Sequence, residues 1–460
     1  MSDFEKKFSF TEDEWQACLK VLNSLKDDPL NNPDNDSLKS LLQKIVKKAR
    51  KENRKVSYAD KVEADLVTQK ESVIVSNALA GVSVYSSEDD SLNEPPLNSD
   101  LKPLHLPKKC YCCNSSFSLA HFFYNRICPD CAALNYEKRN ANKDLSGMTA
   151  VVTGCRVKVG YATVLKLLRC GVDVIATSRF PASALKQYQN ETDFDKWKGR
   201  LKIYGLDLRV LKEVEQFVLY VGREFKQLDI LVNNAAQTIK YPDQYYLPLI
   251  SSEQELLKLE TSNCLPNPTP VGGDLKHLAL EADTPESIPL NRFNQPVDSR
   301  GKTSWNSTLS DISLVELIEV NLINQISPFL LIQSFKEMME RTKQELSFVI
   351  NVTSTEGLFS HTNKTHFHPH TNMTKASLNM ITRTSSEEFS KSNILMNSVD
   401  VGWISTGARE ELRKQQFEKA YVPPLDSVDG ASRILDPVYR ALDGDKSYGK
   451  LFKDYNVHEW

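Results

Sequence analysis

The sequence predicts an α/β protein built on a doubly wound parallel sheet, and three observations support this prediction. From residue 145 to residue 460, short β-branched segments alternate with amphipathic ones, an order that yields parallel strands joined by crossover helices. The first strand runs into a glycine-containing turn and then a helix, as in folds that bind phosphate groups at a helix N-terminus. Polar residues follow several later strands. We expect residues 145–460 to form one domain.

Composition limits the classes of protein to consider. The chain has 460 residues, a formal net charge of −3, 40% apolar residues and 25% charged residues, which is typical of a globular protein. A near-neutral charge argues against nucleic-acid binding through bulk charge. No run of about 18 apolar residues is found, and the chain begins with a charged segment. We therefore expect no membrane span, no secretion and a cytoplasmic location, with the nucleus left open.

Residues 1–70 are predicted to form an arm of two helices. Thr11 and Glu14 have the spacing of a capping box before the first helix. The second helix combines an apolar stripe with a basic face over residues 38–55. This basic helix is compatible with nuclear import, an anionic surface, a protein partner or a solvated face, the commonest origin of charge runs. Residues 71–109, which include an acidic and proline-containing stretch, are predicted to be a linker.

Cysteines cluster in one short segment. Five of the nine fall within residues 110–131, and four of these make two CxxC pairs: Cys110, Cys113, Cys128 and Cys131. Doubled pairs at such spacing are typical of structural zinc sites with four thiolate ligands. We predict a zinc-binding module over residues 110–139. Cys112 and His121 are alternative ligands, and buried free cysteines are the plain alternative to a metal site.

Motifs follow one another in a fixed order from residue 148 onward. They are TGCRVKVG (153–160), DL (207–208), NNAA (233–236), EVNLINQ with Asn321, NVTS with Ser354, TKASLNM with Lys375, and VGWISTG with Thr406. This series resembles the short-chain dehydrogenase/reductase family over residues 145–460. The resemblance implies a Rossmann-type fold and hydride transfer between NAD(P)(H) and a small carbonyl or alcohol substrate. Family members often pair through two central helices, so the resemblance also suggests a homodimer.

The resemblance implies roles for individual residues. The positions that match cofactor-binding residues are Thr153, Gly154, Gly160, Asp207, Leu208, Asn233, Ala235, Lys375 and Thr406. Asn321 would help to hold a proton-relay water, Ser354 would steady the substrate carbonyl, and Lys375 would bond the nicotinamide ribose and lower the pKa of its partner.

Positive charge near the first turn favours NADP(H) over NAD(H). Arg179 closes the second strand, where an acidic residue would bind the 2′-hydroxyl of NAD and a basic one suits a 2′-phosphate. Arg156 and Lys158 add charge in the first turn. A solvent-facing loop arginine is the alternative interpretation of Arg179.

Three positions depart from the family pattern. Lys158 replaces the middle glycine of the turn, Val401 precedes Gly402 where the family has Pro-Gly, and Thr371 stands where the family has its catalytic tyrosine. An aliphatic hydroxyl is a far weaker acid than a phenol. Thr371 can donate a hydrogen bond but does not readily hold an oxyanion, so the change either reroutes or abolishes catalysis.

Four histidines precede Thr371: His361, His366, His368 and His370. Imidazole titrates near neutrality and suits general acid work. We hypothesise that His370 or His368, relayed by Thr371, donates the proton. A metal site and a polar surface loop without a titration role are the alternatives.

The interval from Asn233 to Asn321 is much longer than the family needs, with a surplus at about residues 241–308. This insertion is either a lid anchored by Tyr245, Tyr246 and Trp305 or a peripheral elaboration.

Two functions remain open for the chain as a whole. The chain is an NADP(H)-dependent oxidoreductase with an atypical site, which we favour, or a catalytically weak or inactive NADP(H)-binding scaffold or sensor that acts through its N-terminal modules.

Overall fold

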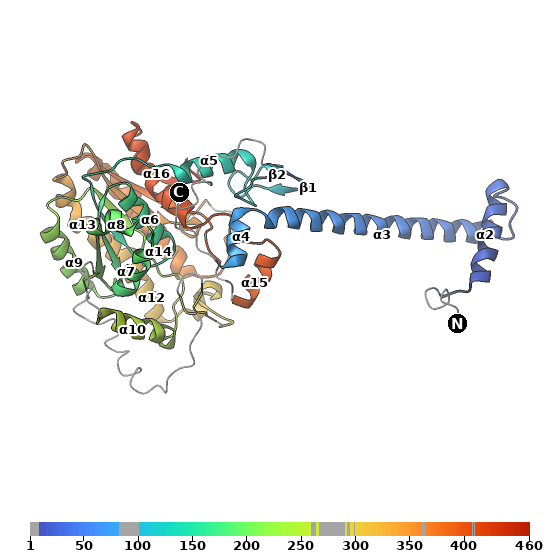
Figure 1. The fold of residues 1–460 in the computed structure, drawn as a ribbon, viewed down its shortest axis with the longest axis horizontal. Helices are drawn as coiled ribbons and strands as arrows, with labels where there is room; N and C mark the ends of the chain where they lie inside the picture. The colour runs from blue at the N-terminus through green and yellow to red at the C-terminus, as the bar shows by residue number, and fades with distance from the viewer. Residues whose placement is uncertain are drawn as a thin grey trace. The chain divides into compact units, whose positions relative to one another are not determined.

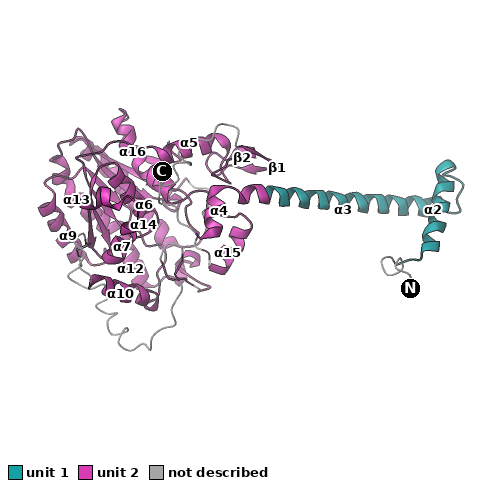
Figure 2. Cartoon of the chain, in the orientation of Figure 1, with its two compact units in different colours: residues 1–65 teal, residues 66–460 magenta. Residues whose placement is uncertain are grey.

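The structure is a computed structural model that describes residues 9–81, 101–258, 264–265, 290–291, 295–298, 300–360, 364–406, 408 and 410–460. It divides into two compact units, residues 1–65 and residues 66–460 (Figure 2). The larger unit holds the α/β domain, and the smaller unit is helical.

The smaller unit contains the two expected helices, α2 (Glu12–Asp27) and most of α3 (Asn35–Lys70). The capping box forms as predicted: the amide of Glu14 donates to Thr11 Oγ1 at 3.2 Å, and the amide of Thr11 donates to Glu14 Oε2 at 2.8 Å. The apolar stripe of α3 stays open to solvent, since Leu41 and Ile45 are 58% and 55% exposed. Packing within the unit therefore does not explain these apolar residues.

The predicted linker over residues 71–109 is wrong for two stretches. Residues Val73–Ala80 form helix α4, whose Ile74, Val75 and Ala78 are buried. Residues Lys102–Lys109 form strand β1, which pairs antiparallel with β2 (Ser116–Ala120). The two prolines of β1 are compatible with a strand because, among the described residues, β1 pairs with β2 alone, and the register of the pair shifts between Pro103 and Lys108. Residues 82–100 lie outside the described part.

A nine-stranded, mostly parallel sheet forms the centre of the larger unit, which confirms the predicted fold class (Figure 1). Its order is β11-β10-β9-β8-β6-β3-β4-β5-β7. The strands are β3 (Thr149–Thr153), β4 (Asp173–Ser178), β5 (Leu201–Gly205), β6 (Ile230–Asn233), β7 (Cys264–Leu265), β8 (Ser347–Thr353), β9 (Ile394–Asp400), β10 (Leu451–Lys453) and β11 (Asn456–His458). Only β11, at one edge, pairs antiparallel, and β7 adds a strand from the insertion to the other edge.

Helices cover both faces of this sheet because each strand buries alternate side chains on opposite sides. Ala150 and Val152 of β3 join one hydrophobic cluster, and Val151 joins the other. The first cluster includes residues of α6 (Lys158–Arg169), α7 (Pro181–Gln189) and α16 (Ser427–Leu442). The second includes residues of α9 (Leu211–Glu224), α13 (Ser327–Glu340) and α14 (Pro369–Ser390).

The predicted cysteine module is not a separate compact unit, because it shares one hydrophobic cluster with the end of the α/β domain. The predicted range, residues 110–139, holds β2 and nearly all of helix α5 (Pro129–Asn140), and β1, which pairs with β2, directly precedes it. Cys110, Phe123 and Ile127 of the module pack with Ile404 and Phe417, and the latter lies in α15 (Glu410–Glu418). The module and the α/β domain therefore have a common core.

The helical run Leu314–Glu340 is long and apolar enough to cross a membrane by length and composition alone. It comprises α12 (Leu314–Asn321), a π-helical turn (Leu322–Ile326) and α13. Leu331, Phe335 and Met339 are fully buried against the sheet. The α13 part of the run thus packs on the sheet of the α/β domain.

Candidate active site and metal centre

The strand order reverses between β3 and β6, where parallel α/β sheets open a crevice at their carboxyl ends. The predicted glycine turn lies here. Thr153 Oγ1, at the end of β3, accepts hydrogen bonds from the amides of Asn234 at 3.1 Å and Ala235 at 3.0 Å. Asn234 Nδ2 in turn donates to the carbonyls of Thr153 and Gly154, both at 3.0 Å. Thr153, Gly154 and Ala235 are brought together as predicted, and Asn234, which the motif contained without a role, links them.

Gly160 has no room for a side chain. A Cβ atom there would lie 1.8 Å from the carbonyl oxygen of Gly154 and 2.4 Å from Asn234 Nδ2. Gly154 itself has a φ of 76°, in the left-handed region that favours glycine. Lys158, which replaces the family's middle glycine, has a φ of 55°, which explains why a glycine suits this position. Gly154 and Gly160 are therefore both required by the backbone of the turn.

A basic corner, formed by Arg156 and Arg179 with Phe180 and Tyr246, lies beside the turn. The Arg179 guanidinium lies 4.8 Å from the centre of the Tyr246 ring, and the Arg156 guanidinium lies 5.6 Å from that of Phe180. Burial lowers the pKa of Arg156 to about 10, and the positive charge of Arg179 acts in the same direction. The Glu253 carboxylate of the insertion offsets this shift only in part.

The described part of the insertion packs on this corner. Helix α10 (Asp243–Leu257) carries Tyr245 and Tyr246, and Tyr245 stacks on Tyr241 with 3.8 Å between ring centres. Glu253 of α10 accepts hydrogen bonds from the amides of Ala182 at 2.6 Å and Ser183 at 2.8 Å, and so caps α7. The predicted anchor Trp305 lies elsewhere, stacked on His368. Residues 259–263 and 266–289 lie outside the described part.

Asp207 and Leu208 follow β5 on the same side of the crevice. Burial alone would raise the pKa of the Asp207 carboxyl, but the guanidinium of Arg209 outweighs it and holds that pKa below its usual value. Arg209 Nη2 donates to Asp207 Oδ2 at 2.6 Å. The carbonyl of Leu208 accepts a hydrogen bond from Ser327 Oγ at 2.7 Å. Arg209, which the sequence did not single out, therefore fixes this edge of the crevice.

Asn233, predicted to line the cofactor groove, is buried in a polar chain that crosses the sheet. Its Nδ2 donates to Asn351 Oδ1 at 2.9 Å, and Asn351 Nδ2 donates to Thr382 Oγ1 at 2.9 Å. These bonds join β6, β8 and α14. Asn233 thus ties β6 to its neighbour β8, on one side of the crevice.

The predicted catalytic residues lie beyond β8 and on α14. Ser354 directly follows β8 and begins a short 3₁₀ turn. Lys375 Nζ donates to the carbonyl of Val352 at 2.7 Å, and burial lowers the pKa of this lysine to about 8. Thr371 lies one turn earlier on α14 and is 3% exposed, and its Oγ1 has no hydrogen-bond partner among the described residues. A buried hydroxyl without a hydrogen-bond partner is costly and therefore uncommon in a folded protein.

Asn321 lies where α12 gives way to the π-helical turn, a feature often found at functional sites. Its Nδ2 donates to the carbonyl of Leu317 at 2.7 Å, within its own helix. Asn324, not singled out from the sequence, reaches further: its Nδ2 donates to the carbonyl of Gln237 at 3.0 Å and to Thr374 Oγ1 at 3.1 Å. Asn324 therefore joins the end of β6 to α14.

Of the four histidines that precede Thr371, the three described ones have separate partners, and none belongs to a group of metal-ligating side chains among the described residues. His370 Nε2 lies 3.2 Å from Glu316 Oε1, although the pair is not aligned as a hydrogen bond, and burial lowers the pKa of His370 more than Glu316 raises it. His368 Nδ1 lies 2.8 Å from the carbonyl oxygen of Trp305, and the two rings stack at 4.3 Å. His366 lies beside Phe367, and His361 is outside the described residues.

Thr406 belongs to the segment that follows β9. Its Oγ1 accepts a hydrogen bond from the amide of Ala408 at 3.1 Å. Gly402, in the same segment, has a φ of 84°, and its amide donates to Asp400 Oδ1 at 2.9 Å. Gly402 thus has the left-handed conformation that favours glycine, with a valine before it.

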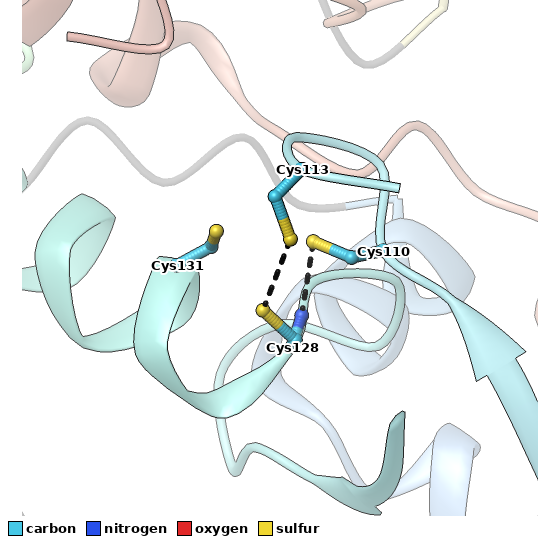
Figure 3. Close-up of side chains that lie close together, drawn as sticks. All are labelled: Cys110, Cys113, Cys128 and Cys131. Atoms are coloured by element: carbon cyan, nitrogen blue, oxygen red, sulfur yellow. Dashed lines mark hydrogen bonds between the residues drawn. The ribbon is translucent and has the colours of Figure 1, made fainter. Parts of the chain in front are cut away.

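The four predicted ligands converge in the cysteine module (Figure 3). All four Sγ atoms lie within 4.8 Å of one another, and Cys113 Sγ is 3.7 Å from Cys128 Sγ. A tetrahedron with Zn–S bonds of about 2.3 Å has edges of about 3.8 Å, whereas a disulfide would need about 2.05 Å. The amide of Cys128 also donates to Cys110 Sγ at 3.3 Å, a contact that supports a thiolate ligand. The residues therefore fit a four-thiolate metal site.

Local structure explains the convergence. Cys110 and Cys113 flank a tight turn that ends at Asn114, whose φ of 59° is tolerated by asparagine. Cys128 and Cys131 lie at the first turn of α5. The two alternative ligands, His121 and Cys112, lie in other surroundings. His121 Nδ1 accepts a hydrogen bond from the amide of Phe123 at 3.1 Å, and burial lowers the pKa of His121 to about 4. Cys112 is not in the cluster.

Comparisons with known proteins agree with this geometry. Residues 148–247 match the family described as short chain dehydrogenase, and residues 292–423 match the family described as Enoyl-(Acyl carrier protein) reductase. An uncharacterised protein, R665, of Acanthamoeba polyphaga mimivirus is 32% identical and covers 76% of this chain and 74% of its own length. Residues 145–460 make up less than 76% of this chain. The match therefore also includes part of the N-terminal segment.

Other relatives match shorter stretches. Mouse retinol dehydrogenase 13 is 36% identical over 20% of this chain and 27% of its own length, and a 2-dehydro-3-deoxy-D-gluconate 5-dehydrogenase of Pseudoalteromonas atlantica is 34% identical over 21% and 38%. Among solved structures, the NADPH-bound carbonyl reductase from chicken fatty liver is 20% identical, covers 69% of this chain and 100% of its own, and has a TM-score of 0.45. From the family matches and the long relative, the chain belongs to the short-chain dehydrogenase/reductase family of NAD(P)-dependent oxidoreductases.

Proposed function

We propose that this protein is an NADP(H)-dependent oxidoreductase that acts on a small carbonyl or alcohol substrate. The basic corner carries the proposal: Arg156 and Arg179 lie together beside the glycine turn, where a 2′-phosphate would pair with both. Thr153, Gly154, Gly160 and Asn234 would hold the pyrophosphate region, and Thr406 and Lys375 the nicotinamide half. The bound cofactor supplies or accepts the hydride.

The proton would come from Lys375 by way of Thr371. Lys375 is buried, and its pKa of about 8 suits general acid work near neutrality. The unpartnered hydroxyl of Thr371 lies one helical turn away and can pass a hydrogen bond to the substrate oxygen. The Glu316 contact of His370 and the Trp305 contact of His368 favour positioning roles for both histidines, so we move the acid role away from them. Ser354 would steady the carbonyl.

Cofactor choice tests the basic corner. Arg179→Glu is expected to weaken NADPH binding by about tenfold to a hundredfold, because a charge-assisted bond to the 2′-phosphate is lost and a like charge replaces it. NADH binding, which needs no such bond, should change by less than about threefold. Fluorescence titration of both nucleotides measures this. Arg223→Ala, at an exposed site on α9, is the control. Equal losses for the two nucleotides would contradict the assignment, and a wild-type protein that binds neither would overturn the proposed function.

The pH dependence tests the proton donor. Carbonyl reduction needs the protonated lysine, so its rate should fall as the pH rises through about 8, while alcohol oxidation should rise through the same range. Lys375→Met should remove both effects, and Thr371→Val should lower the rate without moving the apparent pKa. His370→Gln, the control, should keep the profile. A pH profile that survives in Lys375→Met would assign the proton to another group.

A scaffold or sensor is the second candidate function. The uncovered apolar stripe and basic face of α3 favour it, because they offer a surface for a protein partner in a region without catalytic groups. NADPH binding without oxidation across a panel of aldehydes, ketones and quinones would support this function over the enzyme.

A homodimer through α12–α13 and α14 is compatible with the exposed Leu314, Ile318 and Met380 on these helices.

A further inference from the structure

One tyrosine links the metal module to the loop that follows β9, here called the β9 loop (residues 401–406). Tyr111 stands between the ligands Cys110 and Cys113. Its backbone is held within the module, since its amide donates to the carbonyl of Arg126 at 3.0 Å. Its hydroxyl leaves the module and accepts a hydrogen bond from the amide of Trp403 at 2.7 Å. A residue fixed by the metal turn thus reaches the backbone of the β9 loop.

The β9 loop has a local reason to need this support. The family's proline, which fixes φ by its ring, is Val401 in this chain, so that restriction is missing. The next residue, Gly402, is in the left-handed region with a φ of 84°. A Cβ atom at Gly402 would meet Arg433 Nη1 at 2.4 Å and Tyr111 Oη at 3.3 Å, so the loop is closely packed on both groups. The Tyr111 hydroxyl holds the amide that follows this unusual turn.

A second set of contacts holds the same connection farther along. The Arg126 guanidinium lies 5.0 Å from the ring centre of Trp403 and 4.7 Å from that of Tyr421. Asn125 Nδ2 donates to the carbonyl of Ala420 at 2.8 Å. Both residues come from the module, and all three targets come from the connection between β9 and α16. The module therefore contacts this connection at both ends.

Tyr111 is not a substitute for the missing catalytic tyrosine. Its burial, and then the nearby Asp400 carboxylate, raise the pKa of the phenol, and Arg433 offsets this only in part. Its oxygen is already occupied as the acceptor of a backbone amide. A phenol whose oxygen is already engaged by the backbone suits positioning rather than proton transfer.

We propose that Tyr111 is a positioning residue through which the metal module holds the β9 loop, including Thr406, in its cofactor-binding shape. The inference rests on the proposed binding of NADP(H) at this loop. Its consequence is coupling: because Cys110 and Cys113 flank Tyr111, a metal bound to both fixes the tyrosine, and metal content and nucleotide affinity change together.

The test is Tyr111→Phe in the full zinc-loaded chain, with three readouts: zinc content, NADPH affinity by fluorescence, and amide hydrogen exchange of residues 401–408. Zinc content should remain at one per chain. NADPH affinity should fall by about fivefold to tenfold, and the Trp403 amide should exchange faster by a similar factor, because one hydrogen bond is lost. The KM for NADPH should rise by the same factor while kcat changes less than about twofold.

Tyr124→Phe is the matched control. Tyr124 lies in the same module, but its hydroxyl donates to Asp429 Oδ1 of α16 at 2.6 Å instead of contacting the β9 loop. This variant should lower thermal stability and leave exchange in the loop unchanged. Unchanged affinity and exchange in Tyr111→Phe would overturn the inference, and so would an equal loss of affinity in Tyr124→Phe. A wild-type chain that binds no NADPH would refute the proposed function, whereas the exchange of Trp403 would still report whether Tyr111 holds the loop.

Discussion

Gly160→Ala is expected to weaken NADPH binding by about tenfold to a hundredfold or more. The added methyl group would lie 1.8 Å from the carbonyl oxygen of Gly154, a backbone atom that cannot move away without opening the turn. Overpacking of this kind typically costs about 1–3 kcal/mol or more, which corresponds to a loss of affinity of about tenfold to a hundredfold or greater. Fluorescence titration with NADPH measures the loss, and a thermal scan measures the accompanying decrease in stability.

The matched control is Gly222→Ala. Gly222 lies within α9, and a Cβ atom there would meet nothing within 4 Å. Alanine in a helix interior is favoured over glycine by about 0.5–1 kcal/mol, so this variant should be slightly more stable and should bind NADPH normally. If Gly160→Ala bound NADPH as tightly as the wild type, the turn could not be the nucleotide site.

Loss of the metal ligand Cys110 is expected to have the second large effect. Cys110→Ser should reduce zinc from one per chain to a small fraction and lower the thermal midpoint by at least about 10 °C. Four-thiolate zinc sites contribute about 10 kcal/mol or more in isolated peptides, and Cys110 is also buried in the cluster that the module shares with the α/β domain. Metal analysis and a thermal scan measure both quantities.

Two other cysteines serve as controls. Cys18 is exposed on α2, and Cys112 lies next to the ligands without belonging to their cluster. Cys18→Ser should leave zinc content and stability unchanged, and Cys112→Ser should keep the zinc. A metal-free wild-type protein with the same thermal midpoint as the zinc-loaded one would contradict the metal assignment.

The parts of the molecule that local chemistry decides could be predicted from the sequence. The strands β3, β4, β6 and β8 are short apolar runs with β-branched residues, the glycine turn has its own backbone requirements, and the CxxC spacing brings four sulfur atoms together. The α/β fold class and the family are confirmed. The roles assigned to Ser354, Lys375 and the cofactor-binding residues remain predictions, although the structure brings many of them to one crevice.

The parts that depend on distant contacts could not be predicted. The stretch that ends with β1 is predicted to be a linker from its proline and acidic residues, because composition does not reveal the pairing of β1 with β2. His370 adjoins Thr371 in sequence, yet successive helical residues point about 100° apart, and it meets Glu316 of α12. The contact of Tyr111 with Trp403 joins residues 292 positions apart, and no local pattern encodes it.

The shared core of the module has a consequence for how the chain folds during synthesis. The four cysteines are close in sequence, so the metal turn can form early and locally. The side chains that bind the rest of the module are far away in sequence. Tyr124 bonds Asp429, which is synthesised 305 residues later, and Arg139 bonds Asp426, which is synthesised 287 residues later. At about 5–20 residues per second, roughly 15–60 seconds of translation separate the two sides. The cysteine module, which is synthesised early, thus acquires its full packing only when α16 has been synthesised. A nascent chain truncated before α16 would expose apolar surface that the finished protein buries.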